Sequence, residues 1–413
     1  MNIRYLIPII LMLLVDWYAF QSVKVATDSL QSNLRTALQY FYWSFTVLSI
    51  LAFSLYSTEL HLQIPKPIWT TFRTVLFIAF VAKLPIVLFT GIDDLRRIVL
   101  FVISKFKSSS TEVVYDYSRS KFVSNVAVIA GLIPFSTLFY GIVRNPYRYK
   151  IHRNNVVFPD LPSDLDGFKI IQISDIHSGS FTFKEPIFNA IKMINDEKAD
   201  LICFTGDLVN SRSDEMQPYM DVFNQLRSKF GVYSIFGNHD YGDYATWDSQ
   251  EQKANNLSNL VNIHKKLGWS LLRNENTSIQ VNDAQLDIIG VENYSALPQF
   301  QKYGDLHKAY QGVAKDSFKL LLSHDPSHWD YEVSKKFSDI NLTLSGHTHG
   351  FQFGIEIPGW LRWSPSQYMY KQWAGLYQEG MQYLYVNRGL GFLGYPGRVG
   401  ILPEITVLTL KKA

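Results

Sequence analysis

The chain carries two different patterns of hydrophobic and polar positions, one in its front third and one in the remainder. In the front third, apolar stretches of about 20 residues alternate with short polar segments, and a helix of that length crosses the hydrocarbon core of a bilayer. Four stretches are predicted as transmembrane helices: residues 5–23, 38–57, 68–92 and 122–143. Residues 1–145 are therefore expected to form the membrane region of a multi-pass protein.

Asp16 and Lys83 lie within two of the predicted spans, where an unpaired charge is costly. Charges in such positions often pair with each other or line a pathway. The alternative is that Lys83 extends its long side chain to the headgroups and that Asp16 lies nearer an interface than the predicted bounds. The sequence leaves both alternatives open.

The orientation of the membrane region is predicted from basic residues between the third and fourth spans. The positive-inside rule keeps such a segment in the cytoplasm, so everything after the fourth span is expected on the extracytoplasmic side. A second basic set after the last span argues for the opposite side, but residues that lead into a large domain count for less. The first set is Arg96, Arg97, Lys105, Lys107, Arg119 and Lys121; the second is Arg144, Arg148, Lys150 and Arg153.

From residue 146 to residue 413 the pattern changes to short apolar runs separated by polar, helix-length stretches. The runs are rich in Ile, Val, Leu, Phe and Tyr and end at Gly, Asp or Asn, as buried strands do. Strands are predicted at residues 168–174, 201–205, 232–236, 286–291, 320–323, 342–345 and 383–386, and helices at 185–195, 215–229 and 255–267. This predicts one α/β domain with a two-layer β core and helices outside.

Charge and cysteine content add little to this picture. The formal net charge is +3, with 39 basic and 36 acidic residues, so the bulk electrostatics require no polyanion and no nucleic-acid partner is expected. The single cysteine, Cys203, excludes an intrachain disulfide and lies inside a predicted strand, where a buried thiol is expected.

Asp, Asn and His residues cluster where the predicted strands end. Side chains placed directly after buried strands meet in a cleft at one edge of a sheet. Asp175 and His177, two apart on a segment expected to be extended, would point the same way and bind one ion. Asp207 follows a glycine and has two oxygens, one for each of two ions. The full set of candidate metal ligands is Asp175, His177, Asp207, Asn238, His324, His347 and His349.

Each of these motifs is weak when taken alone. An Asp-x-His is common by chance, and a single buried histidine is more often a hydrogen-bonded core residue than a ligand. Together, and in order at the ends of apolar runs, they predict a metal site with positions left for water and substrate.

The ordered motifs resemble those of the calcineurin-like metallophosphoesterases over about residues 165–410. They are residues 174–177, Gly206-Asp207, residues 237–240, Ser323-His324-Asp325 and residues 346–349. Residues 322–326, 387–391 and 403–406 are similar to the membrane-associated, YkuE-like branch of that superfamily. The resemblance implies a four-layer α/β/β/α sandwich for residues 146–413 and a two-metal hydrolase using Mn, Fe or Zn.

The resemblance also implies roles for the individual residues. It assigns Asp175, His177, Asp207 and His349 to one ion and Asp207, Asn238, His324 and His347 to the other. A hydroxide between the ions would attack phosphorus, and His239, a non-ligand, would stabilise charge or protonate the leaving oxygen.

The chain departs from the family pattern at two places. Asn210 stands where many members have an Asp that pairs with the catalytic histidine, so a carboxylate partner for His239 is in doubt. Phe351 stands where the branch often has a second glycine after the last ligand, so the backbone's approach to the substrate is expected to differ there.

Two further features suggest contacts with the substrate. Arg388 is a candidate phosphate contact because its planar fork matches phosphate oxygens, although it could equally be a surface arginine beside a turn. The segment 359–380 is rich in Trp and Tyr, which suits either a packed flap or an aromatic wall for a lipid-like substrate or the membrane interface.

The expected function is therefore hydrolysis of a phosphate ester or pyrophosphate by a membrane-anchored enzyme. The substrate is expected to be a phosphorylated small molecule or a lipid-linked or cell-envelope compound, because the tether holds the site at a bilayer. The alternative is a membrane sensor or scaffold whose phosphoesterase-like domain binds metal without catalysis.

Overall fold

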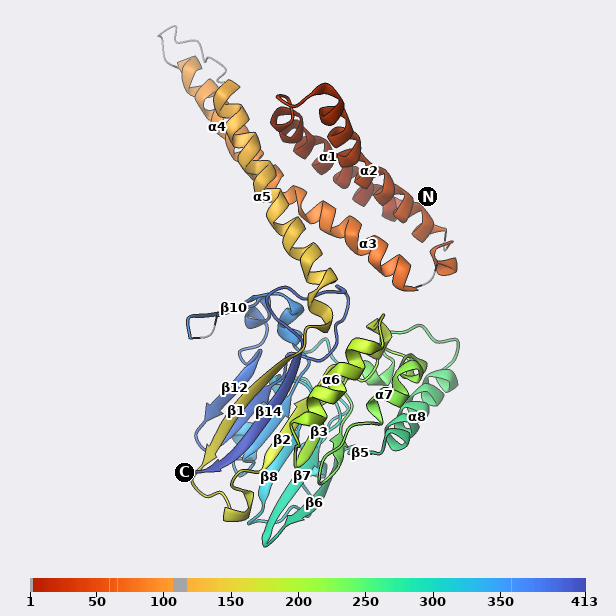
Figure 1. Ribbon diagram of the computed structural model, residues 1–413, viewed down its shortest axis with the longest axis vertical. Helices are drawn as coiled ribbons and strands as arrows, with labels where there is room; N and C mark the ends of the chain where they lie inside the picture. The colour runs from red at the N-terminus through yellow and green to blue at the C-terminus, as the bar shows by residue number, and fades with distance from the viewer. Residues whose placement is uncertain (1–2, 59, 65, 107–116, 358) are drawn as a thin grey trace. The chain divides into compact units, whose positions relative to one another are not determined.

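The computed structural model describes residues 3–58, 60–64, 66–106, 117–357 and 359–413 of the chain (Figure 1). These residues form two compact units, Met1–Gly141 and Ile142–Ala413, which are described separately below.

The N-terminal unit consists of long apolar helices. They are α1 (Ile3–Ala26), α2 (Ser32–Ser57), α3 (Lys66–Val81), α4 (Lys83–Phe106) and α5 (Tyr117–Val143). Within the described residues, four segments are long and apolar enough to cross a membrane: Leu6–Ala26, Ser32–Ser57, Ile68–Lys105 and Ser118–Val143. The four long apolar helical segments that were predicted are present, and their crossing of a membrane stays a prediction. The third is longer than predicted, at 38 residues, and consists of α3 and α4, which are separated at Ala82.

The loop used to predict the orientation is shorter than expected. Arg96, Arg97 and Lys105 lie inside α4, and Lys107 lies outside the described residues. Arg96 and Arg97 also form ion pairs with Asp93, at 3.2 and 2.7 Å. The assignment of these three residues to a loop was wrong, and so was that of Arg119 and Lys121, which lie inside α5. An extracytoplasmic domain stays a prediction.

Asp16 and Lys83 pair with each other inside the N-terminal unit. The Lys83 ammonium lies 2.7 Å from Asp16 Oδ1, and both side chains are buried. The Thr46 hydroxyl donates to the other carboxylate oxygen, and the Tyr42 hydroxyl donates to the Asp16 carbonyl at 2.7 Å. Of the two alternatives for these charges, the structure shows pairing, which joins α1, α2 and the first residue of α4.

The C-terminal unit contains two mixed six-stranded sheets. The first has the order β1 (Lys150–Phe158), β14 (Glu404–Lys412), β2 (Lys169–Ile173), β3 (Leu201–Phe204), β4 (Val232–Ser234), β5 (Trp269–Leu271). The second has the order β12 (Gly375–Glu379), β13 (Gln382–Val386), β9 (Leu342–Ser345), β8 (Phe318–Leu322), β7 (Ala284–Gly290), β6 (Glu275–Val281). A separate hairpin pairs β10 (Ile355–Ile357) with β11 (Leu361–Trp363).

Three hydrophobic clusters separate four layers. One side of the first sheet packs on α6 (Glu185–Asp196), α7 (Met220–Phe223) and α8 (Gln250–Leu267) through residues such as Ile171 and Phe204. Its other side packs on the second sheet, where Leu201 and Leu322 meet. The outer side of the second sheet is covered by α9 (Leu306–Ala309) and the segment around Trp329. The predicted α/β/β/α sandwich is confirmed. It is the expected arrangement for two sheets that are each buried on both faces.

All seven predicted strands are present, with ends shifted by up to two residues. The predicted helix over 215–229 was wrong. The chain there forms a 3₁₀ segment, Ser213–Tyr219, followed by the short α7, because Pro218 has no N–H to continue an α-helical ladder.

Candidate metal centre

The predicted ligands follow the carboxyl ends of neighbouring parallel strands. β2, β3 and β4 are adjacent and parallel in the first sheet, and β8, β9 and β13 are adjacent and parallel in the second. Parallel strands present their carboxyl ends at the same edge. The structure therefore brings all seven predicted ligands together: Asp175 and His177 after β2, Asp207 after β3, Asn238 after β4, His324 after β8, and His347 and His349 after β9.

Five of these residues adopt a left-handed backbone. Their φ values are 50° for Asp175, 47° for His177, 61° for Asp207, 70° for His347 and 51° for His349. The prediction that Asp175 and His177 share an extended segment was therefore wrong in its geometry. Non-glycine residues rarely adopt this conformation, and when they cluster they mark sites where the surrounding structure holds the strain.

Glycines allow the ligand loops to pack directly against one another. Gly206 has φ +96°, and a Cβ there would lie 2.5 Å from the Gly237 nitrogen. A Cβ on Gly346 would lie 2.3 Å from Asp175 Oδ2. Both positions need glycine, because any side chain would push the ligand loops apart.

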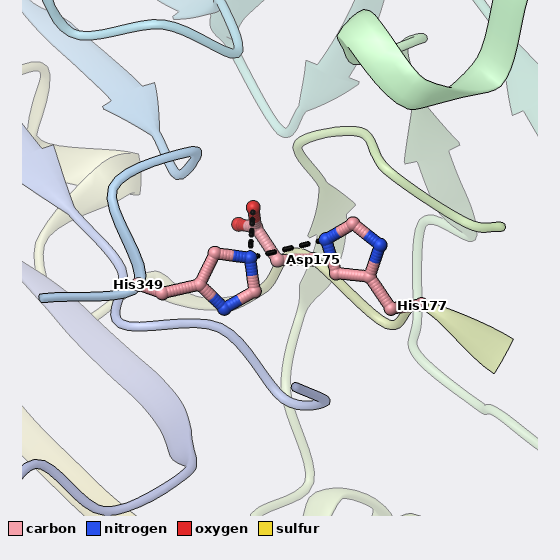
Figure 2. A group of neighbouring side chains, drawn as sticks. All are labelled: Asp175, His177 and His349. Carbon is pink, nitrogen blue, oxygen red and sulfur yellow. Dashed lines mark hydrogen bonds and ion pairs between the residues drawn. The ribbon is translucent and has the colours of Figure 1, made fainter. Parts of the chain in front are cut away.

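Asp175, His177 and His349 form one candidate metal-binding group (Figure 2). His349 Nε2 lies 3.0 Å from His177 Nε2 and 3.2 Å from Asp175 Oδ1. Ligand atoms about 2.1 Å from a common ion are roughly 3.0–3.4 Å apart. These distances therefore match three atoms arranged around one ion.

Asp207, His324 and His347 form the second candidate group. His324 Nε2 lies 3.2 Å from Asp207 Oδ2 and 3.3 Å from His347 Nδ1. Asn238 Oδ1 completes the group, 3.1 Å from His324 Nε2 and 2.8 Å from His347 Nδ1. Asn238 was predicted from sequence and lies where a fourth ligand atom is needed.

A single oxygen of Asp207 connects the two groups. Asp207 Oδ2 is 3.2 Å from His324 Nε2 and 3.6 Å from His177 Nε2. Asp207 Oδ1 accepts the backbone N–H of His239 at 2.8 Å. The sequence suggested one oxygen for each ion, whereas the structure directs Oδ2 at both groups.

The donor set fits divalent cations. His324 Nδ1 donates to the Thr205 carbonyl at 2.7 Å, which leaves a lone pair on Nε2 of the neutral ring. That lone pair faces a carboxylate oxygen of Asp207 and the amide oxygen of Asn238. Because three electron-rich atoms point at one place, a positive charge there would stabilise the site. Burial lowers the pKa of His324, but the nearby Asp207 carboxylate has the larger effect and raises that pKa to about 10. A proton on His324 then supplies the positive charge that a cation would otherwise bring.

Asp240 fixes the loop that carries Asp207, a role that the sequence did not reveal. Its buried carboxylate accepts the backbone N–H groups of Gly237, Asp207 and Leu208, each at 2.9 Å, and that of Val209 at 3.3 Å. Burial and the nearby Asp207 charge raise the pKa of Asp240 to about 7, and the N–H donors oppose that rise. The only available signal was its position at the end of the Gly-Asn-His-Asp motif.

His239 lies beside both groups without belonging to either. Its ring is half-buried and packs edge-on against the His177 ring, with centroids 5.0 Å apart. Its Nδ1 donates to the backbone carbonyl of Asn210 at 2.7 Å, while the Asn210 side chain bonds to Ser180. A backbone carbonyl therefore takes the place of the carboxylate that many family members have at this position, and Nδ1 is the ring nitrogen that it holds.

Arg388 is not free in the way a phosphate-binding residue would be. Its guanidinium is almost fully buried, with one amino group 2.5 Å from Glu404 and the other 2.6 Å from Glu356. These two carboxylates satisfy the fork that the sequence assigned to phosphate. A role for Arg388 in phosphate binding stays a prediction.

Two residues outside the ligand motifs border the ligands: Tyr370, from the aromatic segment 359–380, and Arg398, which the sequence did not single out. The Tyr370 hydroxyl lies 2.8 Å from His347 Nε2, and burial raises the pKa of Tyr370 above its ordinary value. Arg398 is fully buried, donates to the carbonyls of Gly389 and Gly391, and lies 3.5 Å from His349 Nδ1. Neither occurs in a ligand motif, so only tertiary structure places them here.

Comparison with known proteins identifies the family. Residues 168–351 match the calcineurin-like phosphoesterases, and residues 3–146 match the transmembrane domain described as a probable calcineurin-like phosphoesterase. The metallophosphoesterase YkuE of Bacillus subtilis is 31% identical over 284 residues, which cover 66% of this chain and 90% of that protein. The chain belongs to the calcineurin-like metallophosphoesterases. It is therefore a metal-dependent hydrolase of phosphoric ester bonds with a membrane region.

Animal relatives of this metallophosphoesterase are longer. A transmembrane protein with metallophosphoesterase domain from Bos taurus is 30% identical over 61% of this chain and 55% of its own length. Its counterpart in Danio rerio is 28% identical over 69% of this chain and 63% of its own length. The chain spans a little over half the length of these two proteins. The name of each mentions both a transmembrane protein and a metallophosphoesterase domain.

Proposed function

We propose that this metallophosphoesterase hydrolyses a phosphate ester or pyrophosphate with two metal ions, on a lipid-linked or cell-envelope substrate. The observation that carries the proposal is the pair of ligand groups that share Asp207 Oδ2. Residues 146–413 would be the catalytic domain, and residues 1–145 its membrane anchor. The domain would lie on the extracytoplasmic side.

The ligand groups would each hold one divalent cation. Asp175, His177, Asp207 and His349 would bind the first, and Asp207, Asn238, His324 and His347 the second. Mn, Fe and Zn all suit ligands of this type. When bound, two such cations supply a hydroxide at neutral pH and neutralise charge on the phosphoryl oxygens.

His239 would act on the leaving group. Because Nδ1 donates to the fixed carbonyl of Asn210, the ring keeps one orientation and Nε2 faces the site. A protonated His239 then delivers its Nε2 proton to the departing oxygen. The neutral carbonyl supports this orientation without adding the negative charge that a carboxylate partner would bring.

A membrane-associated substrate is supported by the short connection between the two regions. α5 ends at Val143 and β1 begins at Lys150. Asn145 and Pro146, between them, are buried in the C-terminal unit. The catalytic domain would thus begin within a few residues of the last span, near the layer where lipid phosphates are concentrated.

The competing function is a membrane sensor or scaffold with a non-catalytic domain. Such a protein has no need of a histidine that binds no metal yet is oriented toward the ligand groups. The presence of His239 together with every predicted ligand favours the enzyme.

The test is turnover of a generic aryl phosphodiester by the purified full-length protein in detergent, loaded separately with Mn, Fe or Zn. Asp207→Ala and His239→Ala should each abolish most of the turnover, whereas His307→Ala, a largely exposed histidine, should leave it unchanged. Absence of turnover with all three metals, or full activity in both site variants, would refute the enzyme. Mass spectrometry of lipid and metabolite extracts treated with wild-type or His239→Ala protein would then identify the substrate.

A further inference from the structure

The segment 351–357, which follows the last ligand and runs from a 3₁₀ turn into β10, has an inverted pattern of exposure. Phe351, Phe353, Ile355 and Ile357 are exposed by 58%, 38%, 47% and 42%, while the residues between them turn inward. A strand on the surface of a soluble domain normally buries its apolar side chains and exposes its polar ones. Here the apolar face points out.

The hairpin of β10 and β11, where Figure 1 labels β10, carries further exposed apolar side chains. Trp360 is 79% exposed, Leu361 39%, Tyr368 77% and Met369 52%. We call the exposed apolar residues of this segment the apolar rim: Phe351, Phe353, Ile355, Ile357, Trp360, Leu361, Tyr368 and Met369. Large exposed apolar side chains gathered on one short segment mark an interaction surface.

Buried polar partners fix the inverted orientation. The Gln352 amide donates to the carbonyls of Tyr395 and Gly397 and accepts the N–H of Leu393. Glu356 pairs with the buried Arg388 at 2.6 Å. A one-residue slip that buried the apolar face would break all of these contacts, so the exposure of the rim is specified by the fold.

The base of the rim lies close to the point where the chain leaves the membrane region. Val399 makes two backbone hydrogen bonds to the segment 351–357. Its N–H donates to the Gln352 carbonyl at 2.8 Å, and its carbonyl accepts from the Gly354 N–H at 2.9 Å. The carbonyl of the preceding residue, Arg398, accepts from the Asn145 amide at 2.8 Å. Asn145 is two residues beyond the end of α5, at Val143.

The rim is also attached to the metal centre. The Thr348 hydroxyl donates to the Trp373 carbonyl at 2.6 Å, and the Ser364 hydroxyl donates to the Gly350 carbonyl at 2.7 Å. Thr348 and Gly350 flank the candidate ligand His349. The same short segment therefore carries a ligand at one end and the exposed apolar side chains at the other.

We propose that the apolar rim inserts into the interfacial layer of the bilayer and presents lipid phosphate headgroups to the metal centre. The bilayer is the expected occupant because the rim's base is joined through Val399 and Arg398 to the end of α5. Trp and Tyr at its exposed tip are the side chains that favour the headgroup region. The insertion stands independently, whereas the choice of a lipid substrate rests on the proposed function.

Spin labelling of the full-length chain in phospholipid nanodiscs tests the insertion. Cys203 is fully buried, so a label directed to Trp360→Cys reports on that position alone. Asp283→Cys, exposed in the turn between β6 and β7 at the opposite strand ends, is the matched control. The label at 360 should be several-fold more accessible to oxygen and less accessible to a nickel chelate than the control, as in a bilayer interface.

Two outcomes would overturn the insertion. Nickel access at position 360 equal to that of the control would leave the rim in water. Protection from both oxygen and nickel would mean that protein, either another copy or another part of the chain, covers the rim.

Activity of the double variant Trp360→Ser, Leu361→Ser tests the role in presenting substrate. Turnover of a soluble aryl phosphodiester should stay at the wild-type level, while turnover of phospholipid in vesicles should fall on the order of tenfold. Equal loss on both substrates, or on neither, would contradict the role. If wild-type protein hydrolyses neither substrate, the proposed function fails and the spin-label result still decides the insertion.

Discussion

The carboxylate of Asp240 allows a sharp test of how the metal centre is built. Its Oδ2 accepts the N–H groups of Gly237 and Asp207, and its Oδ1 those of Leu208 and Val209. In Asp240→Asn the side chain keeps its shape, but one oxygen becomes an NH₂ group. In either amide orientation, two buried N–H donors then face another donor instead of an acceptor.

The cost follows from these two lost contacts. A hydrogen bond to a charged group contributes about 1.5–3 kcal/mol, so losing two should destabilise the domain by roughly 3–6 kcal/mol. For a domain of this size, each kcal/mol lowers the unfolding temperature by about 2 °C, so a fall of roughly 6–12 °C is expected. Because these N–H groups belong to the Asp207 loop, retention of metal at that loop should weaken as well.

Thermal unfolding of the full-length protein in detergent, followed by tryptophan fluorescence at pH 8, measures the change. At that pH the Asp240 carboxyl, whose pKa is raised to about 7, is largely ionised. Asp243→Asn is the matched control, because its partly exposed pair with Lys253 should contribute less than about 1 kcal/mol. An unfolding temperature for Asp240→Asn within about 2 °C of the control would refute the reasoning.

Three further predictions concern buried charges. Arg388→Met leaves the carboxylates of Glu404 and Glu356 without their cation, which should destabilise the domain by about 3–5 kcal/mol and lower its unfolding temperature by roughly 6–10 °C. A raised KM for aryl phosphate with an unchanged unfolding temperature would instead support a phosphate contact. Although burial opposes its charge, Arg388 lowers the pKa of Glu404 to about 2 from an ordinary 4.5, so this stabilisation is present above pH 4.5 and lost as the pH falls toward 2. Glu404→Gln should therefore flatten acid unfolding in that window, and an unchanged curve would contradict it. Asp16→Asn and Lys83→Met should each destabilise the membrane region by about 3–5 kcal/mol in detergent, and the double variant should be destabilised less than either single variant. The measurement is the fraction of protein that stays monodisperse in detergent after heating. If the losses in the two single variants add up in the double variant, the pair is uncoupled.

The sequence was informative where apolar runs and chemistry coincide. Seven strands could be predicted because most of their side chains are buried. Five of them end at polar ligands, and that arrangement placed the ligands at one edge. β1 and β14 escaped prediction for physical reasons. β1 has polar residues along half its length, and β14 pairs with it in parallel from 254 positions away, as in the pair Phe158 and Lys412. No local pattern specifies such a pairing.

The details of the site depended on backbone conformations that sequence does not reveal. The left-handed φ of Asp175 and His177 replaced the extended segment that alternation suggested. The choice of Oδ2 as the shared atom of Asp207 follows from the His239 N–H, which occupies Oδ1. Arg388 was recognised as important, but its carboxylate partners come from distant segments and are visible only in the fold.

The short connection after α5 has a consequence for how this protein meets dissolved molecules. In the attachment proposed above, the site would sample only a thin layer of solution at the membrane surface, because Asn145 and Pro146, just after α5, are buried in the C-terminal unit. A leaflet rich in anionic lipid has a surface potential of about −30 mV, which lowers the local concentration of a doubly charged phosphate ester by roughly tenfold. A dianionic dissolved ester should therefore show an apparent affinity in anionic vesicles that rises with added salt, while an uncharged reporter is unaffected. In that arrangement the membrane would repel dissolved anions and so lower their concentration at the site.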